Sequence, residues 1–147
     1  MNGRVTRAAR ALPGAVRRRL VLWGPVAAWM TVIFVLSSLS APRSPVPAND
    51  KVQHFVGYGI LGALAVRATA GGRLTGVTMR AAAAAWAIAT AYGVTDEYHQ
   101  NFVPERSPEA ADIAADALGA GAAVAAVWAF GIIDRSRRPA GAPPRRR

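Results

Sequence analysis

The charged residues of this chain are sorted strictly against its apolar runs. Three segments, 1–19, 67–80 and 135–147, hold 15 of the 18 basic residues. The polar stretches between them hold 7 of the 8 acidic residues. Four apolar stretches separate these zones, so basic and acidic connections alternate along the chain. Multi-span membrane proteins show this alternation because their basic loops stay on the cytoplasmic side. The pattern predicts a chain that crosses a membrane four times.

The apolar stretches predict four transmembrane helices, over 20–40, 50–68, 79–100 and 108–133. At about 1.5 Å per residue, helices of this length cross a hydrocarbon core of about 30 Å. The second helix is the weakest span, because it carries Lys51 and His54 in its first turns. Glycine also lowers helix propensity there. We interpret Gly57, Gly59 and Gly62 as positions of close helix packing, which small residues allow in membranes.

The predicted fold is all-α, an integral membrane four-helix bundle in the plasma membrane with both termini cytoplasmic. It divides into a basic cytoplasmic tail (1–19), a four-span membrane domain (20–134) and a disordered, Arg/Pro-rich cytoplasmic tail (135–147). A cleaved signal peptide is the rival interpretation of the first apolar run. That run is longer than the roughly 7–15 residues of a typical signal-peptide core, so an uncleaved span is favoured.

Turn and cap residues predict where the helices begin. A proline-rich loop precedes Asn49 and Asp50, either of which is expected to cap the second helix. Glycines within 71–76 predict the cytoplasmic turn before the third helix. Ser107 followed by Pro108 predicts an N-cap and a first helical residue for the fourth helix.

The net charge of +10 and the pI near 11.6 are compatible with nucleic-acid binding. However, the arginines flank apolar spans and form no basic stripe interleaved with aromatic residues. Attraction to anionic cytoplasmic lipid accounts for them better. We therefore expect membrane lipid as a partner and no nucleic acid. The absence of cysteine excludes disulfides and thiolate metal sites, and the sequence gives no indication of the oligomeric state.

Three predicted helices carry polar residues four positions apart near their outer ends, which places them on one helix face. These ladders are Asp50, His54 and Tyr58; Tyr92, Asp96 and Gln100, with Glu97 and His99 beside them; and Asp112 and Asp116. A carboxylate as deep as that of Asp116 is costly unless it faces protein, water or a cation. We therefore expect the ladders to face one another around a polar pocket, with Lys51, Arg43 and Arg106 as counter-ions. The alternative is a self-contained network that only holds the helices in register.

These polar residues also carry a family resemblance. The motifs are Asp50-Lys51-x-x-His54-Phe55, then Tyr58, then Asp96-Glu97-x-x-Gln100-x-x-x-Pro104-x-Arg106-Ser107, then Asp112 and Gly119. Over about 20–133 the chain resembles the VanZ-like family, which is named for a member linked to teicoplanin resistance. The resemblance implies a small, mostly four-helix integral membrane protein. By position, the family's motif residues are Asp50, Lys51, His54, Asp96, Glu97, Gln100, Arg106 and Asp112. The chain departs from the family at Glu105, where Gly is common, and at Asp116, where Asn is common.

We predict that the outer pocket binds or shields a charged cell-envelope component, either a lipid-linked wall precursor or a glycopeptide antibiotic. The candidate ligand-binding residues are Asp50, Lys51, His54, Tyr58, Asp96, Glu97, Gln100, Arg106, Asp112 and Asp116. Lys51 and Arg106 would meet anionic groups. The carboxylates would meet ammonium groups or order the cations.

A membrane enzyme acting on a lipid-borne phosphate or sugar is the alternative. His54 or His99 would then serve as general base, or His54, Asp96 and Asp112 would hold a divalent cation. No recognised ligand spacing is present, so we expect no metal and no cofactor, and we assign no catalytic residue. A proton relay is disfavoured because the cytoplasmic halves of the predicted spans lack acids.

Overall fold

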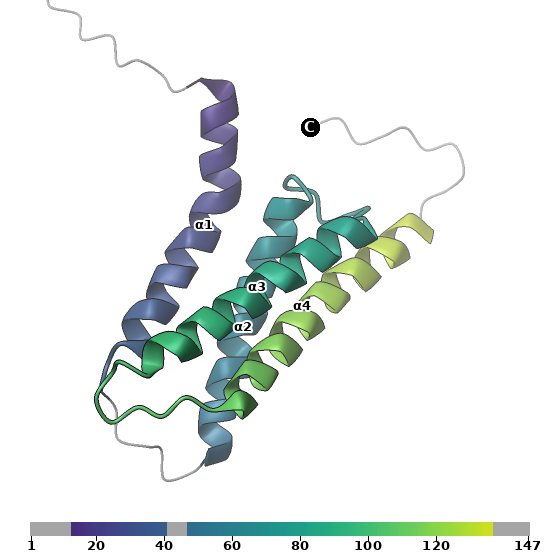
Figure 1. Ribbon diagram of the computed structural model, residues 1–147. Coiled ribbons are helices and arrows are strands. Elements are labelled where there is room, and N and C mark those ends of the chain that lie inside the picture. Colours follow the sequence, from purple (N-terminus) through teal and green to yellow (C-terminus); the bar gives the residue numbers. More distant parts are fainter. Residues whose placement is uncertain (1–12, 41–46, 137–147) are drawn as a thin grey trace, which may run out of the picture.

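Four α-helices and no strands form the part of the chain that the computed structural model describes, residues 13–40 and 47–136. The helices are α1 (Gly14–Ser37), α2 (Pro47–Thr69), α3 (Met79–Gln100) and α4 (Ala110–Ser136). Successive helices run in opposite directions, so α1 and α3 begin at the end of the molecule where α2 and α4 finish (Figure 1). The all-α prediction with four helices is confirmed.

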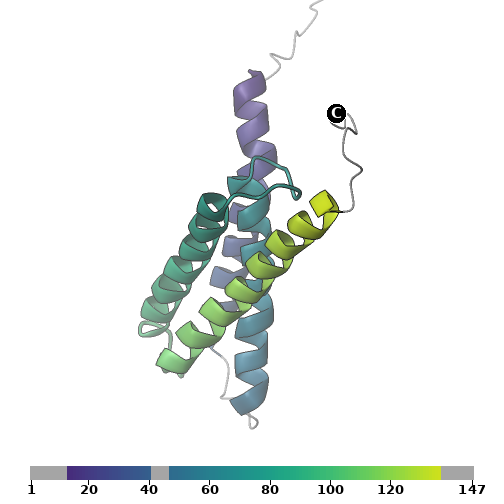
Figure 2. The same cartoon turned by 90° about the vertical axis from the view of Figure 1, so that its right-hand side faces the viewer.

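The helix bounds agree with the sequence at α3 and differ elsewhere. α3 covers the predicted 79–100, whereas α1 begins at Gly14 and its first turns extend beyond the other helices (Figure 1 and Figure 2). α2 begins at Pro47, so the predicted cap at Asn49 or Asp50 was wrong. Proline suits a first helical turn, because the backbone N–H that it lacks would have no partner there. Segments 1–12, 41–46 and 137–147 of the predicted tails and loop lie outside the described residues.

The beginning of α4 is set by a neighbouring helix. The predicted cap at Ser107 and first residue at Pro108 were wrong, because α4 begins at Ala110. The backbone N–H of Glu109, just before the helix, instead donates to Oε2 of Glu97 on α3 at 3.0 Å. A carboxylate beside a helix N-terminus satisfies a free donor and complements the helix dipole. Residues far apart in sequence therefore fix this boundary.

The connection between α2 and α3 is a glycine turn, as predicted. Gly71, Gly72 and Gly76 have φ values of 66°, 87° and 77°, in the left-handed region that favours glycine. The hydroxyl of Thr78 then caps α3 by accepting the N–H of Ala81 at 3.2 Å. This tight turn lays α3 back along α2.

α2 and α4 pack so closely that their backbones touch. A Cβ atom on Gly119 would clash with the carbonyl oxygen of Phe55, and one on Gly62 would lie 2.8 Å from the carbonyl oxygen of Ala120. The close-packing interpretation is therefore confirmed at Gly62. It was wrong at Gly57, where an added Cβ would meet nothing within 4 Å. Because the two backbones touch, even short side chains in the N-terminal half of one helix can contact the other helix.

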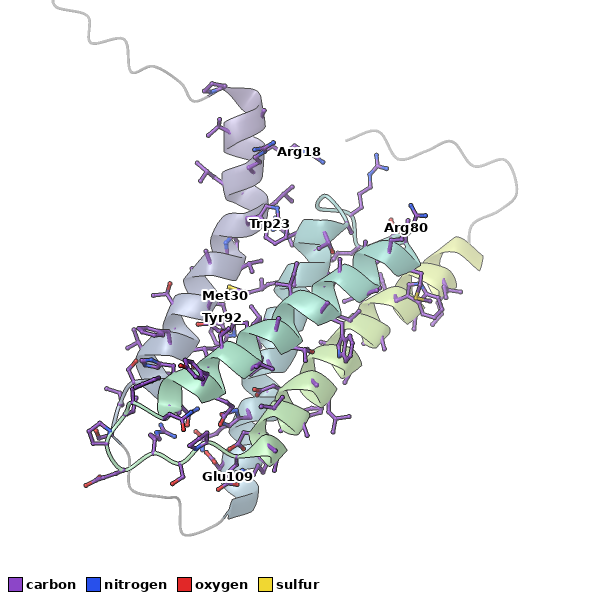
Figure 3. All side chains as sticks on the ribbon, viewed as in Figure 1. Arg18, Trp23, Met30, Arg80, Tyr92 and Glu109 are labelled. Carbon is purple, nitrogen blue, oxygen red and sulfur yellow. The ribbon has the colours of Figure 1, made fainter. Side chains whose placement is uncertain are left out.

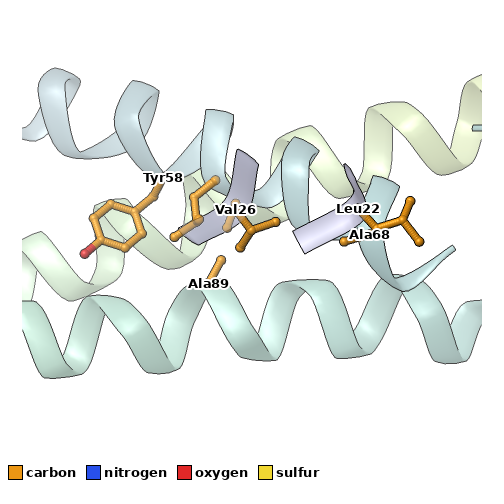
Figure 4. Packing of buried hydrophobic residues seen from close by; sticks show 7 residues of the cluster. Leu22, Val26, Tyr58, Ala68 and Ala89 are labelled. Atoms are coloured by element: carbon orange, nitrogen blue, oxygen red, sulfur yellow. The ribbon is translucent and has the colours of Figure 1, made fainter. Parts of the chain in front are cut away.

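α1 lies along α2 and touches α3, but it makes no contact with α4 within the described residues. Its buried residues Leu22 and Val26 join Tyr58, Ala68 and Ala89 in one apolar core (Figure 4). The bundle is thus a tight group of α2, α3 and α4 with α1 on one side.

Two of the described helices, over Gly14–Ser37 and Ala110–Ile133, are long and apolar enough to cross a membrane. These are the first and fourth predicted spans. α2 and α3 are less apolar because charged residues lie near their ends, among them Lys51 and Arg67 on α2. By length and composition, two of the four predicted spans are thus compatible with crossing a membrane.

Candidate ligand-binding site at the acidic end

The charges of the described chain separate between the two ends of the bundle. Arg18 and Arg80 lie at one end, and Glu109 lies at the other (Figure 3). We call the second the acidic end and define it by its described carboxylates: Asp50, Asp96, Glu97, Glu105, Glu109, Asp112 and Asp116. The acidic end combines the first turn of α2 with the last turns of α3, the first turns of α4 and the connection between α3 and α4. Two parts of the chain that are distant in sequence, at residue 50 and over 96–116, therefore supply its carboxylates.

Lys51 joins α2 to α4 at the acidic end. Its Nζ donates to Oδ1 of Asp112 and to Oε2 of Glu109, the latter at 2.8 Å, and lies 3.8 Å from Oδ2 of Asp50. The side chain of Asp112 is only 5% exposed, whereas that of Glu109 is 48% exposed. A buried ion pair is worth more than an exposed one only when its hydrogen bonds are made. Lys51 therefore serves as the counter-ion that the sequence predicted, chiefly for Asp112.

One turn further along both helices, His54 meets Asp116. His54 Nδ1 and Asp116 Oδ1 are 2.9 Å apart, and the Asp116 side chain is fully buried. Gly93 of α3 makes room for this carboxylate, because a Cβ there would lie 2.6 Å from Asp116 Oδ2. That second oxygen has no hydrogen-bond partner among the described residues. The deep carboxylate therefore faces protein, as the sequence analysis expected, with one oxygen unsatisfied.

Tyr58 completes the polar face of α2. Its ring lies parallel to that of His54, with the centroids 6.3 Å apart. The hydroxyl is buried and makes no hydrogen bond within the described part of the chain. Asp96 and Asp116 act on it electrostatically. The ladder of Asp50, His54 and Tyr58 therefore exists as predicted and runs from the surface into the bundle.

The polar residues of α3 divide between two neighbours instead of all facing the pocket. Asp96, which is 4% exposed, accepts a 2.6 Å hydrogen bond from Ser37 Oγ of α1. Tyr92 also faces α1, because its hydroxyl donates to the carbonyl of Met30 at 2.6 Å. The prediction that the polar ladder of α3 faces the ladders of α2 and α4 is therefore only partly met.

Glu97 faces the beginning of α4, and Gln100 lies beside it on α3. Gln100 Nε2 donates to Glu97 Oε1 at 3.0 Å, and the other oxygen of Glu97 accepts the Glu109 N–H. Both side chains are buried. These two candidate residues of the site hold the α3–α4 connection in place.

Arg106 does not serve as a counter-ion for the acids within the described residues. Its guanidinium donates to the carbonyls of Leu39 and Leu36 at 3.3 and 3.4 Å. Free carbonyls at a helix C-terminus carry partial negative charge and attract cations. The expected pairing of Arg106 with acids was therefore wrong, and Arg43 lies outside the described residues.

The contribution of α1 to the acidic end was not predicted from the sequence. Ser37 binds Asp96, and Ser38 Oγ lies 3.0 Å from His99 Nε2. Trp29 Nε1 donates to the carbonyl of Gly57 at 2.9 Å. The available signal was the Ser-Ser pair near the end of an otherwise apolar run. α1 thus supplies hydrogen bonds that hold the α3 side of the acidic end.

A surface groove of the described part of the chain lies away from these residues. A groove of about 350 Å³ runs between α3 and α4 and is lined by apolar side chains such as Met79, Trp86 and Trp128. The charged side chains of the acidic end are instead paired with one another. The arrangement presents two chemical features: a surplus of carboxylates over the cations Lys51 and Arg106, and an imidazole fixed by a buried acid.

These features define a class of protein: a small all-α chain with apolar helices and one carboxylate-rich end. The VanZ/LLP1 family model matches residues 20–131. The chain belongs to the VanZ/LLP1 family, and the resemblance drawn from the sequence is confirmed. Neither the curated proteins nor the solved structures gave a match.

Proposed function

We propose that this chain crosses the plasma membrane four times with both termini in the cytoplasm. Its outward acidic end then binds or shields a charged cell-envelope component. Family membership and the two apolar helices support the membrane placement. The four helices run alongside one another and have 22 to 27 residues each. Helices of that length match the membrane thickness at about 1.5 Å per residue.

Exposed apolar side chains support the same placement. Val21 and Leu36 on α1 are 53% and 57% exposed, and Leu118 and Phe130 on α4 are 66% and 59% exposed. Apolar surface on this scale marks an interaction surface in a protein that is folded in water. Lipid chains would cover the sides of α1 that do not pack against α2 and α3, because beyond Arg19 this helix is apolar around its whole circumference.

The surplus of carboxylates at the acidic end carries the proposal for the ligand. Seven carboxylates stand there against the two described cations Lys51 and Arg106, both of which already make hydrogen bonds. Such an end attracts positive charge, so it favours ammonium groups over phosphates. Ammonium groups occur on the peptide part of a lipid-linked wall precursor and on glycopeptide antibiotics. We therefore favour recognition of these parts.

Native mass spectrometry of the full chain in nanodiscs tests the proposal. EDTA-treated protein is incubated with a lipid-linked wall precursor or a glycopeptide, and the bound fraction is measured. We expect Asp112→Asn to lower binding at least about tenfold, because losing one charged contact costs about 1.4 kcal/mol or more.

Glu109→Gln is the matched control. It removes the same charge from another carboxylate that Lys51 contacts, but at an exposed position. Thermal unfolding of both variants is measured in parallel to confirm that they fold. Wild-type protein that binds neither ligand, or equal binding by the two variants, would contradict the proposal.

A further inference from the structure

We propose that Asp50, His54 and Asp112 bind a divalent transition-metal cation, Zn²⁺ or Mn²⁺, between α2 and α4. One ligand atom from each of these residues lies within 4.8 Å of the others. Asp50 and His54 are one helical turn apart on α2, and Asp112 is in the first turn of α4. The tight α2–α4 contact at Gly119 holds the two helices at this spacing. The site is therefore built by the packing of the fold.

The orientation of His54 is an independent observation that points to a metal. Asp116 lies outside the three ligands, is fully buried and holds Nδ1 of His54 at 2.9 Å. Metal-binding histidines commonly donate one ring N–H to a carboxylate, which fixes the ring and leaves the other nitrogen for the ion. Nε2 of His54 makes no hydrogen bond within the described residues. Burying the Asp116 carboxylate costs free energy. A role in orienting His54 as a metal ligand would explain why a carboxylate is buried there.

The donor set selects the kind of ion. One imidazole nitrogen and two carboxylate oxygens suit Zn²⁺ or Mn²⁺, whereas Mg²⁺ and Ca²⁺ prefer oxygen ligands alone. Zinc binds these donors at about 2.0–2.2 Å in tetrahedral geometry, so two of its ligand atoms lie about 3.3–3.6 Å apart. Bringing the three ligand atoms from within 4.8 Å of one another to that separation needs only a small side-chain movement. Asp50 can supply it, since its side chain is 37% exposed.

Lys51 competes for the same carboxylates but leaves room for a cation. It occupies Oδ1 of Asp112 and stands 3.8 Å from Asp50. The second oxygen of Asp112 accepts no hydrogen bond from the described residues. Lys51 is also the one cation described within this group of ligands. A divalent ion would therefore neutralise carboxylate charge that Lys51 leaves uncompensated.

The sequence analysis expected no metal and considered only His54, Asp96 and Asp112 as a ligand set. Asp96 is held by Ser37 of α1 instead, and Asp50 takes its place. This inference concerns the same acidic end but does not depend on the proposed function. Metal binding is measured without any envelope ligand, and the ligand assay above is performed in EDTA, so the two fail separately.

Isothermal titration calorimetry of the full chain in detergent, without a histidine tag, tests the site with Zn²⁺ and Mn²⁺. The background is low, because the sequence contains two histidines and no cysteine. We expect one ion per chain. Asp50→Asn should weaken binding by about 10- to 100-fold or more, since even outer-shell partners contribute that much. Asp50 is partly exposed, so this variant should fold normally.

Glu109→Gln is the control for charge alone, because it removes one carboxylate from the same end without touching the ligand set. Its affinity should stay within about threefold of wild type, as expected for a partly exposed charge. His99→Gln should likewise retain the site, since His99 lies against Ser38, the residue that follows α1. The proposal would be overturned if the wild-type protein bound neither Zn²⁺ nor Mn²⁺ at one ion per chain. It would also be overturned if Asp50→Asn and Glu109→Gln lost the same amount of metal affinity.

Discussion

Asp96 owes its place inside the bundle to the hydroxyl group of Ser37. The two side chains are 2.6 Å apart and buried, and they join α3 to α1. A buried carboxylate that loses its donor pays the full cost of desolvation. The next residue, Ser38, makes a comparable bond to His99 at 3.0 Å in a less buried position. Adjacent serines with the same chemistry thus differ mainly in the charge and burial of their partners.

Ser37→Ala should destabilise the protein by about 1.5–3 kcal/mol, as expected for a hydrogen bond to a charged group. Ser38→Ala, the matched control, should cost less than about 1.5 kcal/mol. The free energy of unfolding is measured in mixed micelles for both variants. Equal effects would show that the burial of Asp96 does not depend on Ser37.

The sequence predicted which polar residues share a helix face better than it predicted their hydrogen-bond partners. Period-four spacing placed Asp50, His54 and Tyr58 on one face of a helix, and the structure has them there. The same rule could not assign Asp96 to α1, because partner choice depends on how the helices are arranged in three dimensions. Ser37 was overlooked because the Ser37-Ser38 pair has no helical periodicity that would assign it a partner on another helix.

At the scale of the helices, the α2–α4 contact determines the spacing of the acidic end. Gly119 and Gly62 bring the two backbones together, and no side chain separates them there. Lys51 and His54 can then reach Asp112 and Asp116 across the gap. Small residues at such positions are a common means of helix association in membranes.

Gly119→Ala should therefore destabilise the protein by about 1–3 kcal/mol, the usual cost of overpacking. Gly57→Ala should be neutral or stabilising by up to about 1 kcal/mol, since the added methyl group meets no atom and alanine favours helix. Thermal unfolding in detergent compares the two. If Gly119→Ala is tolerated as well as Gly57→Ala, the close contact does not exist in solution.

Helix bounds show how far local sequence signals extend. Apolar length gave α3 its correct bounds, and glycines marked the turn before it. The beginnings of α2 and α4 were misplaced, because the expected caps were local side chains. For α4 the capping carboxylate comes from Glu97, 12 residues earlier on another helix. Such a cap becomes visible only when the helices are packed.

At the scale of the whole molecule, charge separation links topology to the site. The described arginines Arg18 and Arg67 lie toward the opposite end from the carboxylates, which we call the basic end, and donate to the backbone carbonyls of Gly71 and Val21. The carboxylates gather at the opposite end. If the positive-inside rule holds, the basic end is cytoplasmic and the acidic end faces outside. Both the proposed ligand and the proposed metal would then be encountered from the outer side.

Cysteine labelling of intact cells tests this orientation most directly, because the chain contains no cysteine of its own. Phe102→Cys is placed in the connection between α3 and α4, where residue 102 is 69% exposed. Leu74→Cys is placed in the turn between α2 and α3, where residue 74 is 45% exposed. A membrane-impermeant maleimide should label the first in whole cells and the second only after lysis. Labelling of position 74 in whole cells, or protection of position 102, would contradict the account.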